Sequence, residues 1–273
     1  MSLESPQWSL SPASDVLRSQ TSVSRALDRL VIYFRDDIMM KDGYPWDLMF
    51  VHSLKALASW RSFTEGAGAS MKGDRSTLVP QTSWLYDLIC AFLCHGFGGT
   101  SVRDLAMAQP PSIFRSKDLL QTWILSYCLI YWSPFDAVFQ LVSTPRSLTS
   151  LLVTTFEAID SSTTLCGSVD KAQELFPESP AAPFVASLLA GIGGSILRYL
   201  ERRLGRGWAH EQTEWSQPSD TIRRTVIYTL AYMMLSKVKG PIKARAWIAT
   251  FHVFLSLSQE LSGLELDFTK GLM

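Results

Sequence analysis

Apolar runs alternate with polar stretches along the chain and divide it into seven hydrophobic segments. Residues 84–102, 119–139 and 184–200 form the three strongest runs. The first two hold 19 and 21 residues, close to the ~20 that cross a hydrocarbon layer as a helix. We predict all three as membrane spans, with Pro134 kinking the second. Residues 61–80 are rich in Gly, Ser and charge and are predicted as a loop.

Four weaker segments cover residues 46–60, 148–167, 225–236 and 246–258. Residues 148–167 are rich in Ser and Thr, so hydropathy alone does not predict a span there. The last two runs are short and become spans only if the Lys and Arg side chains at their ends extend toward the membrane surface.

One short phrase occurs twice, once in each half of the chain. Residues 98–103 read G-G-T-S-V-R, and residues 193–198 read G-G-S-I-L-R. A Gly inside a helix costs roughly 1 kcal/mol relative to Ala, so we predict a hinge or pore position in each copy, at Gly98, Gly99, Gly193 and Gly194. Close helix packing is the alternative. Gly-interrupted segments at matching places predict an inverted 3+3 repeat plus one helix.

These segments predict an all-α polytopic membrane protein with seven transmembrane helices. Its transmembrane domain is expected at residues 43–262, with one repeat at about 43–142, the second at about 145–238 and the seventh helix at about 242–260. Residues 1–42 are expected to form a polar tail with a short amphipathic segment, and residues 263–273 a C-terminal tail.

Composition agrees with a membrane protein and excludes several other classes. Only 18% of the 273 residues are charged, against about 25% in ordinary soluble domains. The formal net charge of +0 gives no electrostatic reason to expect a nucleic-acid partner. Cys90, Cys94 and His95 are interpreted as packing residues, because no second ligand cluster for a metal lies nearby. No nucleophile–base set predicts an enzyme, and no cofactor is expected.

Ionisable residues inside the apolar segments are the candidates for a water-filled path, since a charge facing lipid costs several kcal/mol. They are Lys55, Arg103, Asp104, Glu157, Asp160, Arg198 and Glu201, of which Asp104 and Glu201 also lie near segment ends. Arg103 and Arg198 lie near segment ends, where extending to the membrane surface is the alternative. Glu157 lies in the middle of its segment and is the strongest candidate. We interpret His52 as a hydrogen-bonded interior histidine, with a pH sensor as the alternative.

The order of several motifs is similar to that of one known family. They are S-W at residues 83–84, G-F-G-G at 96–99, A-Q-P-P at 108–111, Y-W-S-P-F-D at 131–136 and G-I-G-G at 191–194. With these motifs, residues 44–258 resemble the trimeric intracellular cation (TRIC) channels. The resemblance implies a homotrimer in an intracellular membrane, the endoplasmic reticulum. It also implies that each protomer conducts monovalent cations, mainly potassium, as the counter-current to calcium release.

The chain departs from the family pattern on the fourth segment. The family motif K-E-V-x-R appears here as F-E-A-I-D at residues 156–160. The family's Lys and Arg are associated with an anionic phosphoinositide, and the matching positions hold Phe156 and Asp160. We therefore expect this membrane-lipid site to be lost or moved to other basic residues. Two other functions stay open: a solute transporter with alternating access, and a non-conducting membrane scaffold with the same fold.

Overall fold

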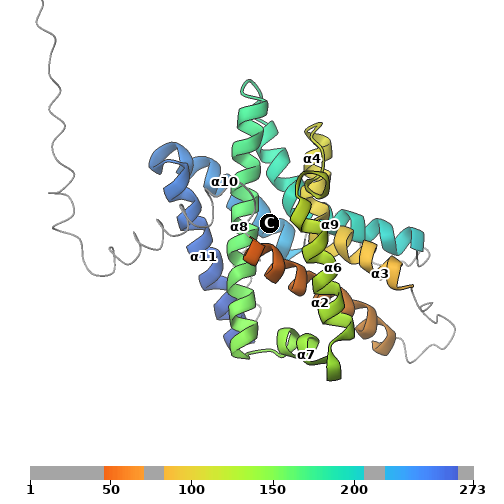
Figure 1. The fold of residues 1–273 in the computed structure, drawn as a ribbon. Helices are drawn as coiled ribbons and strands as arrows, with labels where there is room; N and C mark the ends of the chain where they lie inside the picture. Colours follow the sequence, from red (N-terminus) through yellow and green to blue (C-terminus); the bar gives the residue numbers. More distant parts are fainter. Residues whose placement is uncertain (1–45, 71–82, 206–218, 264–273) are drawn as a thin grey trace, which may run out of the picture. The chain divides into compact units, whose positions relative to one another are not determined.

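Helices form all the regular structure of the described residues, which are 46–70, 83–205 and 219–263 of a computed structural model (Figure 1). They all belong to one unit, residues 43–273. The elements are α2 (Trp46–Ser70), α3 (Trp84–Ala91), the π-helix η3 (Phe92–Gly96), α4 (Gly98–Ala106), α5 (Ser112–Arg115), α6 (Lys117–Trp132), the 3₁₀-helix η4 (Pro134–Asp136), α7 (Ala137–Ser143), α8 (Leu148–Leu175), α9 (Ala182–Gly205), α10 (Asp220–Lys239) and α11 (Pro241–Ser262). The all-α expectation is confirmed, whereas both expected tails, apart from Gly263, lie outside the described residues. The boundaries of the two repeats stay a prediction.

Helix α2 extends ten residues beyond the first hydrophobic segment, so the loop predicted from residue 61 is wrong for residues 61–70. The extension has packing partners that its composition does not show. Trp60 is fully buried, and Phe63 packs against the same core cluster. Arg61 makes a two-point ion pair with Asp136, 75 residues away, with both N···O distances at 3.1 Å.

The first predicted span is bent rather than straight. The axes of residues 84–96 and 98–106 differ by 69°, and Phe97 stands between them outside the helical region at φ −100° and ψ 13°. A Cβ added at Gly98 would lie 1.7 Å from the carbonyl oxygen of Leu93. No other residue fits this backbone, so Gly98 permits the bend.

The second predicted span, residues 119–139, is two helices and not one. Helix α6 ends at Trp132, and Phe135 and Asp136 take positive φ angles of 55° and 56° before α7 begins. Pro134 has no N–H to donate to the carbonyl of Ile130, four residues earlier. Arg61 donates to that carbonyl instead, at 2.8 Å. The predicted kink at Pro134 is therefore a complete break between two helices, which a distant arginine stabilises.

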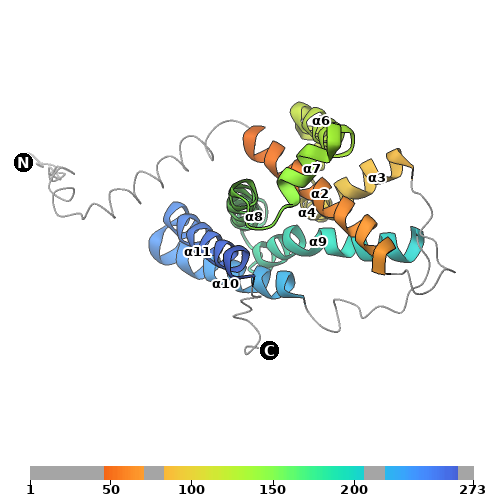
Figure 2. The same cartoon turned by 90° about the horizontal axis from the view of Figure 1, so that it is seen from below.

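The two copies of the glycine phrase pack against each other where α4 crosses α9 (Figures 1 and 2). A Cβ at Gly193 would lie 2.8 Å from Cα of Gly99, and a Cβ at Gly99 would lie 2.1 Å from the carbonyl oxygen of Ala190. A Cβ added at Gly194 would lie 3.1 Å from the carbonyl oxygen of Cys94. Helix α9 is continuous through Gly193 and Gly194. The geometry at the crossing is that of small residues bringing two backbones together.

Hydropathy predicts few of the helices as membrane spans, although the burial of their polar residues suits a membrane protein. Of the described helices, residues 182–201 in α9 are long and apolar enough to cross a membrane alone, and the bent pair from Trp84 to Ala106 passes the same test together. Helix α8 has 28 residues, a length of about 42 Å, yet it is too polar to pass. Its polar residues Asp160, Ser162 and Ser168 are buried, whereas Leu148 and Leu152 are exposed. This arrangement, polar inside and apolar outside, suits a helix within a membrane protein.

A pair of glycine substitutions tests the crossing of α4 and α9. Gly99→Ala places a methyl group against backbone and should destabilise the protein by about 1–3 kcal/mol. Gly167→Ala on α8 is the matched control, because a Cβ there meets nothing within 4 Å and Ala is the better helix former. Thermal unfolding of the detergent-purified protein should show a lower midpoint for Gly99→Ala alone. Equal midpoints for the two variants would contradict the close approach.

Candidate functional site

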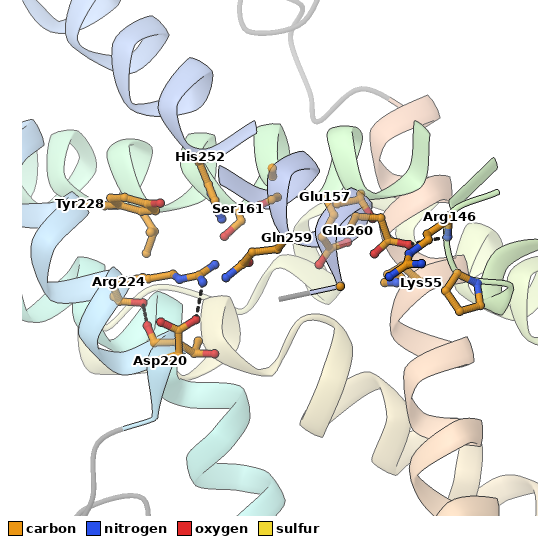
Figure 3. Close-up of a pocket in the computed structure, with 18 residues that line it drawn as sticks. Lys55, Arg146, Glu157, Ser161, Asp220, Arg224, Tyr228, His252, Gln259 and Glu260 are labelled. Atoms are coloured by element: carbon orange, nitrogen blue, oxygen red, sulfur yellow. Dashed lines mark hydrogen bonds and ion pairs between the residues drawn. The ribbon is translucent and has the colours of Figure 1, made fainter. Parts of the chain in front are cut away.

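A polar cavity of about 900 Å³ lies among α2, α8, α10 and α11 (Figure 3). Helix α8 packs against the other three helices, so its length forms one wall. The polar lining residues are Lys55, Arg146, Thr154, Glu157, Ser161, Asp220, Thr221, Arg224, Thr225, Tyr228, His252, Ser256, Gln259 and Glu260.

Helices α10 and α11 each turn a regularly spaced polar face toward the cavity. On α10, Asp220, Arg224 and Tyr228 recur at every fourth residue, and on α11 His252, Ser256 and Glu260 do the same. Residues spaced by four lie on one face of a helix. The polar faces of α10 and α11 are therefore directed toward the polar face of α8.

The cavity holds both signs of charge, and most of the charged groups have protein partners. Arg224 pairs with Asp220 at 2.6 Å within α10. Glu260 accepts hydrogen bonds from the Ser150 hydroxyl at 2.7 Å and from the Arg146 backbone N–H at 3.1 Å. Glu157 pairs with a histidine, and 36% of its side-chain area remains accessible. Glu157 is thus an acid in mid-helix that reaches the cavity.

That histidine is His52, which joins α2 to α8 and to the bend. Its Nδ1 lies 3.4 Å from a carboxylate oxygen of Glu157 and 3.3 Å from one of Asp160. Its Nε2 lies 3.3 Å from the carbonyl oxygen of Gly96, the last residue of η3. The Phe97 ring meets the imidazole nearly edge-on, with centroids 5.0 Å apart. The interior histidine expected from the sequence therefore connects α2 to α8 and to the bend after η3.

The candidate residues from the sequence separate into three groups. Lys55 and Glu157 line the cavity, and Asp160 lies buried beside His52. The four glycines lie at the crossing of α4 and α9, and none of them lines the cavity. Their roles as pore or hinge stay a prediction.

The two arginine candidates do not line the cavity either. Arg198 donates to the Ser195 hydroxyl at 3.0 Å within α9. Arg103 belongs to a buried network around Asp104, to which its Nε and Nη2 donate at 3.0 and 2.7 Å. Lys171 contacts the same oxygen of Asp104 at 3.3 Å, and Arg115 pairs with the other oxygen. Arg103 is therefore held in a network that ties α4 to α8.

The two residues that depart from the family motif, Phe156 and Asp160, lie on different sides of α8. Phe156 is exposed on the outer side of α8, away from the cavity lining, and Asp160 is buried against α2. Neither offers a cationic donor to a phosphate group. The loss or relocation of the lipid site stays a prediction.

Several cavity residues were not predicted from the sequence. They are Arg146, Asp220, Arg224, Tyr228, His252, Gln259 and Glu260. Most of them share a spacing by four. Asp220, Arg224 and Glu260 lie outside the apolar runs, and Tyr228 and His252 lie inside them, so hydropathy alone does not connect them. The described residues contain no group of His, Cys, Asp and Glu that could hold a metal ion.

Comparison with known proteins places this geometry in a family. The family model described as the TRIC channel matches residues 71–260. No curated protein matches the chain.

Solved structures share the fold at low sequence identity. One, described as the structural basis for activity of TRIC counter-ion channels in calcium release, gives a TM-score of 0.68 at 15% identity and covers 87% of this chain and 100% of its own. A trimeric intracellular cation channel from C. elegans with bound Ca²⁺ gives 0.64 at 15% identity, covering 87% and 99%. The same channel in the absence of Ca²⁺ gives 0.64 at 16% identity, covering 89% and 98%.

The network around Asp104 predicts a large effect of a single charge change. The Asp104 side chain is 0% exposed and has three cationic partners. Asp104→Asn leaves those cations without their anion and should destabilise the protein by about 3–5 kcal/mol. Asp118→Asn at the exposed start of α6 is the control and should change little. Unfolding by denaturant measures both, and equal stability of the two variants would show that Asp104 is dispensable.

Proposed function

The chain belongs to the TRIC channel family, and from that membership we propose that it conducts monovalent cations, mainly potassium, through the cavity among α2, α8, α10 and α11. Members of this family are multi-pass membrane channels and not enzymes. The specific ion and the specific path are our proposal.

The observation that carries the proposal is the direction of the polar faces. Helices α8, α10 and α11 turn polar residues toward one cavity, while Leu152, Met234 and Phe254 on the same three helices are exposed on other faces. A cavity with charged and hydroxyl side chains from several helices can hold a hydrated cation in a low-dielectric layer. Because charged side chains line this cavity of about 900 Å³, we propose that the path selects by charge more than by size.

We extend the proposal to assembly and location. The C. elegans structures are described as trimeric and intracellular, and we propose a homotrimer in the endoplasmic reticulum membrane for this chain. There it would supply a potassium counter-current for calcium release; TRIC counter-ion channels in calcium release have a similar fold. The exposed apolar residues on α6, such as Ile124 and Leu125, suit lipid or another protomer equally.

A solute transporter is the second candidate, and the 69° bend between η3 and α4 favours it. Broken helices with free carbonyls form the substrate sites of many transporters. The two functions differ in flux. Unitary current steps from the purified protein in a planar bilayer require a channel, whereas saturable uptake without current steps requires a transporter.

Glu157 provides the test of the path. Glu157→Gln removes a negative charge that faces the cavity, and one such charge within several Å of an ion is worth on the order of 2 kcal/mol at an effective dielectric constant of about 20. We expect the unitary potassium conductance at low salt to fall at least about threefold, with a smaller loss at high salt. Glu178→Gln, in the exposed turn after α8, is the control and should conduct as the unmodified protein does. Equal conductance of the two variants would move the path away from α8.

A further inference from the structure

We propose that His52, Glu157 and Asp160 form a binding site for one shared proton, and that this proton competes with the permeant cation for Glu157. The inference deepens the proposed function and rests on it for the identity of the cation. Its geometry, however, stands on the three side chains alone.

The contacts of His52 require an additional proton. Its Nε2 lies against the Gly96 carbonyl, which only accepts hydrogen bonds, so Nε2 carries a hydrogen. The Nδ1 atom then faces one oxygen of Glu157 and one of Asp160, and ionised carboxylates also only accept. An unprotonated Nδ1 at 3.3 and 3.4 Å from two ionised carboxylates is repelled by both, and it makes no hydrogen bond to either. The contacts become favourable when one more proton lies on Nδ1 or on either carboxyl group.

Because the cluster is buried, binding the additional proton lowers the energetic cost of its negative charge. The His52 side chain is 13% exposed and that of Asp160 is 7% exposed, and Asp160 Oδ1 has no hydrogen-bond partner in the described part of the chain. Without the shared proton the cluster would carry two negative charges, and with it one. Buried charge is costly unless it is paired. The three groups therefore bind the proton as one unit rather than independently.

Several elements packed around the cluster carry other charged or titratable groups. On α2 itself Lys55 follows one turn after His52 and lines the cavity, and on α11 His252 lines it too. His252 contacts the Ser162 hydroxyl at 3.0 Å through Nδ1. The bent segment contributes the Gly96 carbonyl and the Phe97 ring. On α10 the nearest cavity charges, Arg224 and Asp220, already form a pair.

Glu157 links the proton to the ion path, because it contacts His52 and also lines the cavity. When the proton is bound, the imidazolium offsets the charge of Glu157 and weakens its attraction for a cation. When the proton leaves, the cluster carries two negative charges and a cation in the cavity takes over the compensation. Proton and cation thus bind in competition, and conductance should rise as the pH rises.

Nuclear magnetic resonance of ¹⁵N-histidine tests the competition without requiring current. The chain has four histidines, and the spectrum of His52→Gln identifies the signal of His52. We expect the midpoint of the His52 titration to lie at lower pH in potassium chloride than in an equal concentration of N-methylglucamine chloride. Asp160→Asn removes one carboxylate and should lower the midpoint by about one pH unit, a tenfold weaker proton affinity. A midpoint that is the same in both salts, or unmoved by Asp160→Asn, would overturn the proposal.

Single-channel recording between about pH 5.5 and 8.5 gives the functional readout. Potassium conductance should increase severalfold with pH in the unmodified protein, and His52→Gln should remove most of this dependence. His95→Gln is the matched control, since His95 packs against Trp60 and Phe63 instead. A pH profile unchanged by His52→Gln would also overturn the inference. Absence of current at every pH would contradict the proposed function, while the salt-dependent midpoint would still decide whether the proton site exists.

Discussion

Polar side chains inside a membrane need a protein partner or water, because hydrocarbon offers neither. Helix α8 carries more of these groups than hydropathy tolerates in a span, and it pairs several of them with neighbouring helices. Near its start Ser150 binds Glu260 of α11, and near its end Asp170 binds Tyr232 of α10 and Arg245 of α11. Between them lies Asp160 against His52. The neighbouring helices supply most of these partners, and beside the cavity Glu157 of α8 remains partly accessible.

The elements that the sequence predicted well are those that depend on residues close together in the chain. The spacing and composition of the apolar runs predicted helices throughout, and the repeated glycine phrase marked the crossing of α4 and α9. Glu157 and Lys55 were recognisable because a charge in mid-segment is costly anywhere in a membrane. The break after Trp132 was predicted as a kink, but its extent depends on Arg61, which is 69 residues from Ile130 along the chain. No window of local sequence holds both residues.

The site itself could be predicted only in part, for the same physical reason. The cavity requires three polar faces to meet, and α10 and α11 place their charges at the ends of apolar runs, where they resemble ordinary flanking residues. The His52 cluster needs α2 and α8 to meet at the bend of η3. Asp160 was visible as a departure from the family motif, yet only the fold places it against His52. That contact turns an apparent loss of a lipid site into a candidate proton site.

The central claim is that the polar face of α8 lines a water-filled path for cations, and chemical access to this face tests it most directly. After replacement of the four cysteines, Ser161→Cys places a thiol in the cavity and Leu152→Cys places one on the opposite, exposed side of the same helix. A cationic methanethiosulfonate reagent should react with the thiol at position 161 and reduce the potassium current. The thiol at position 152 should leave the current unchanged. Block through position 152, with position 161 unreactive in a conducting protein, would contradict the account.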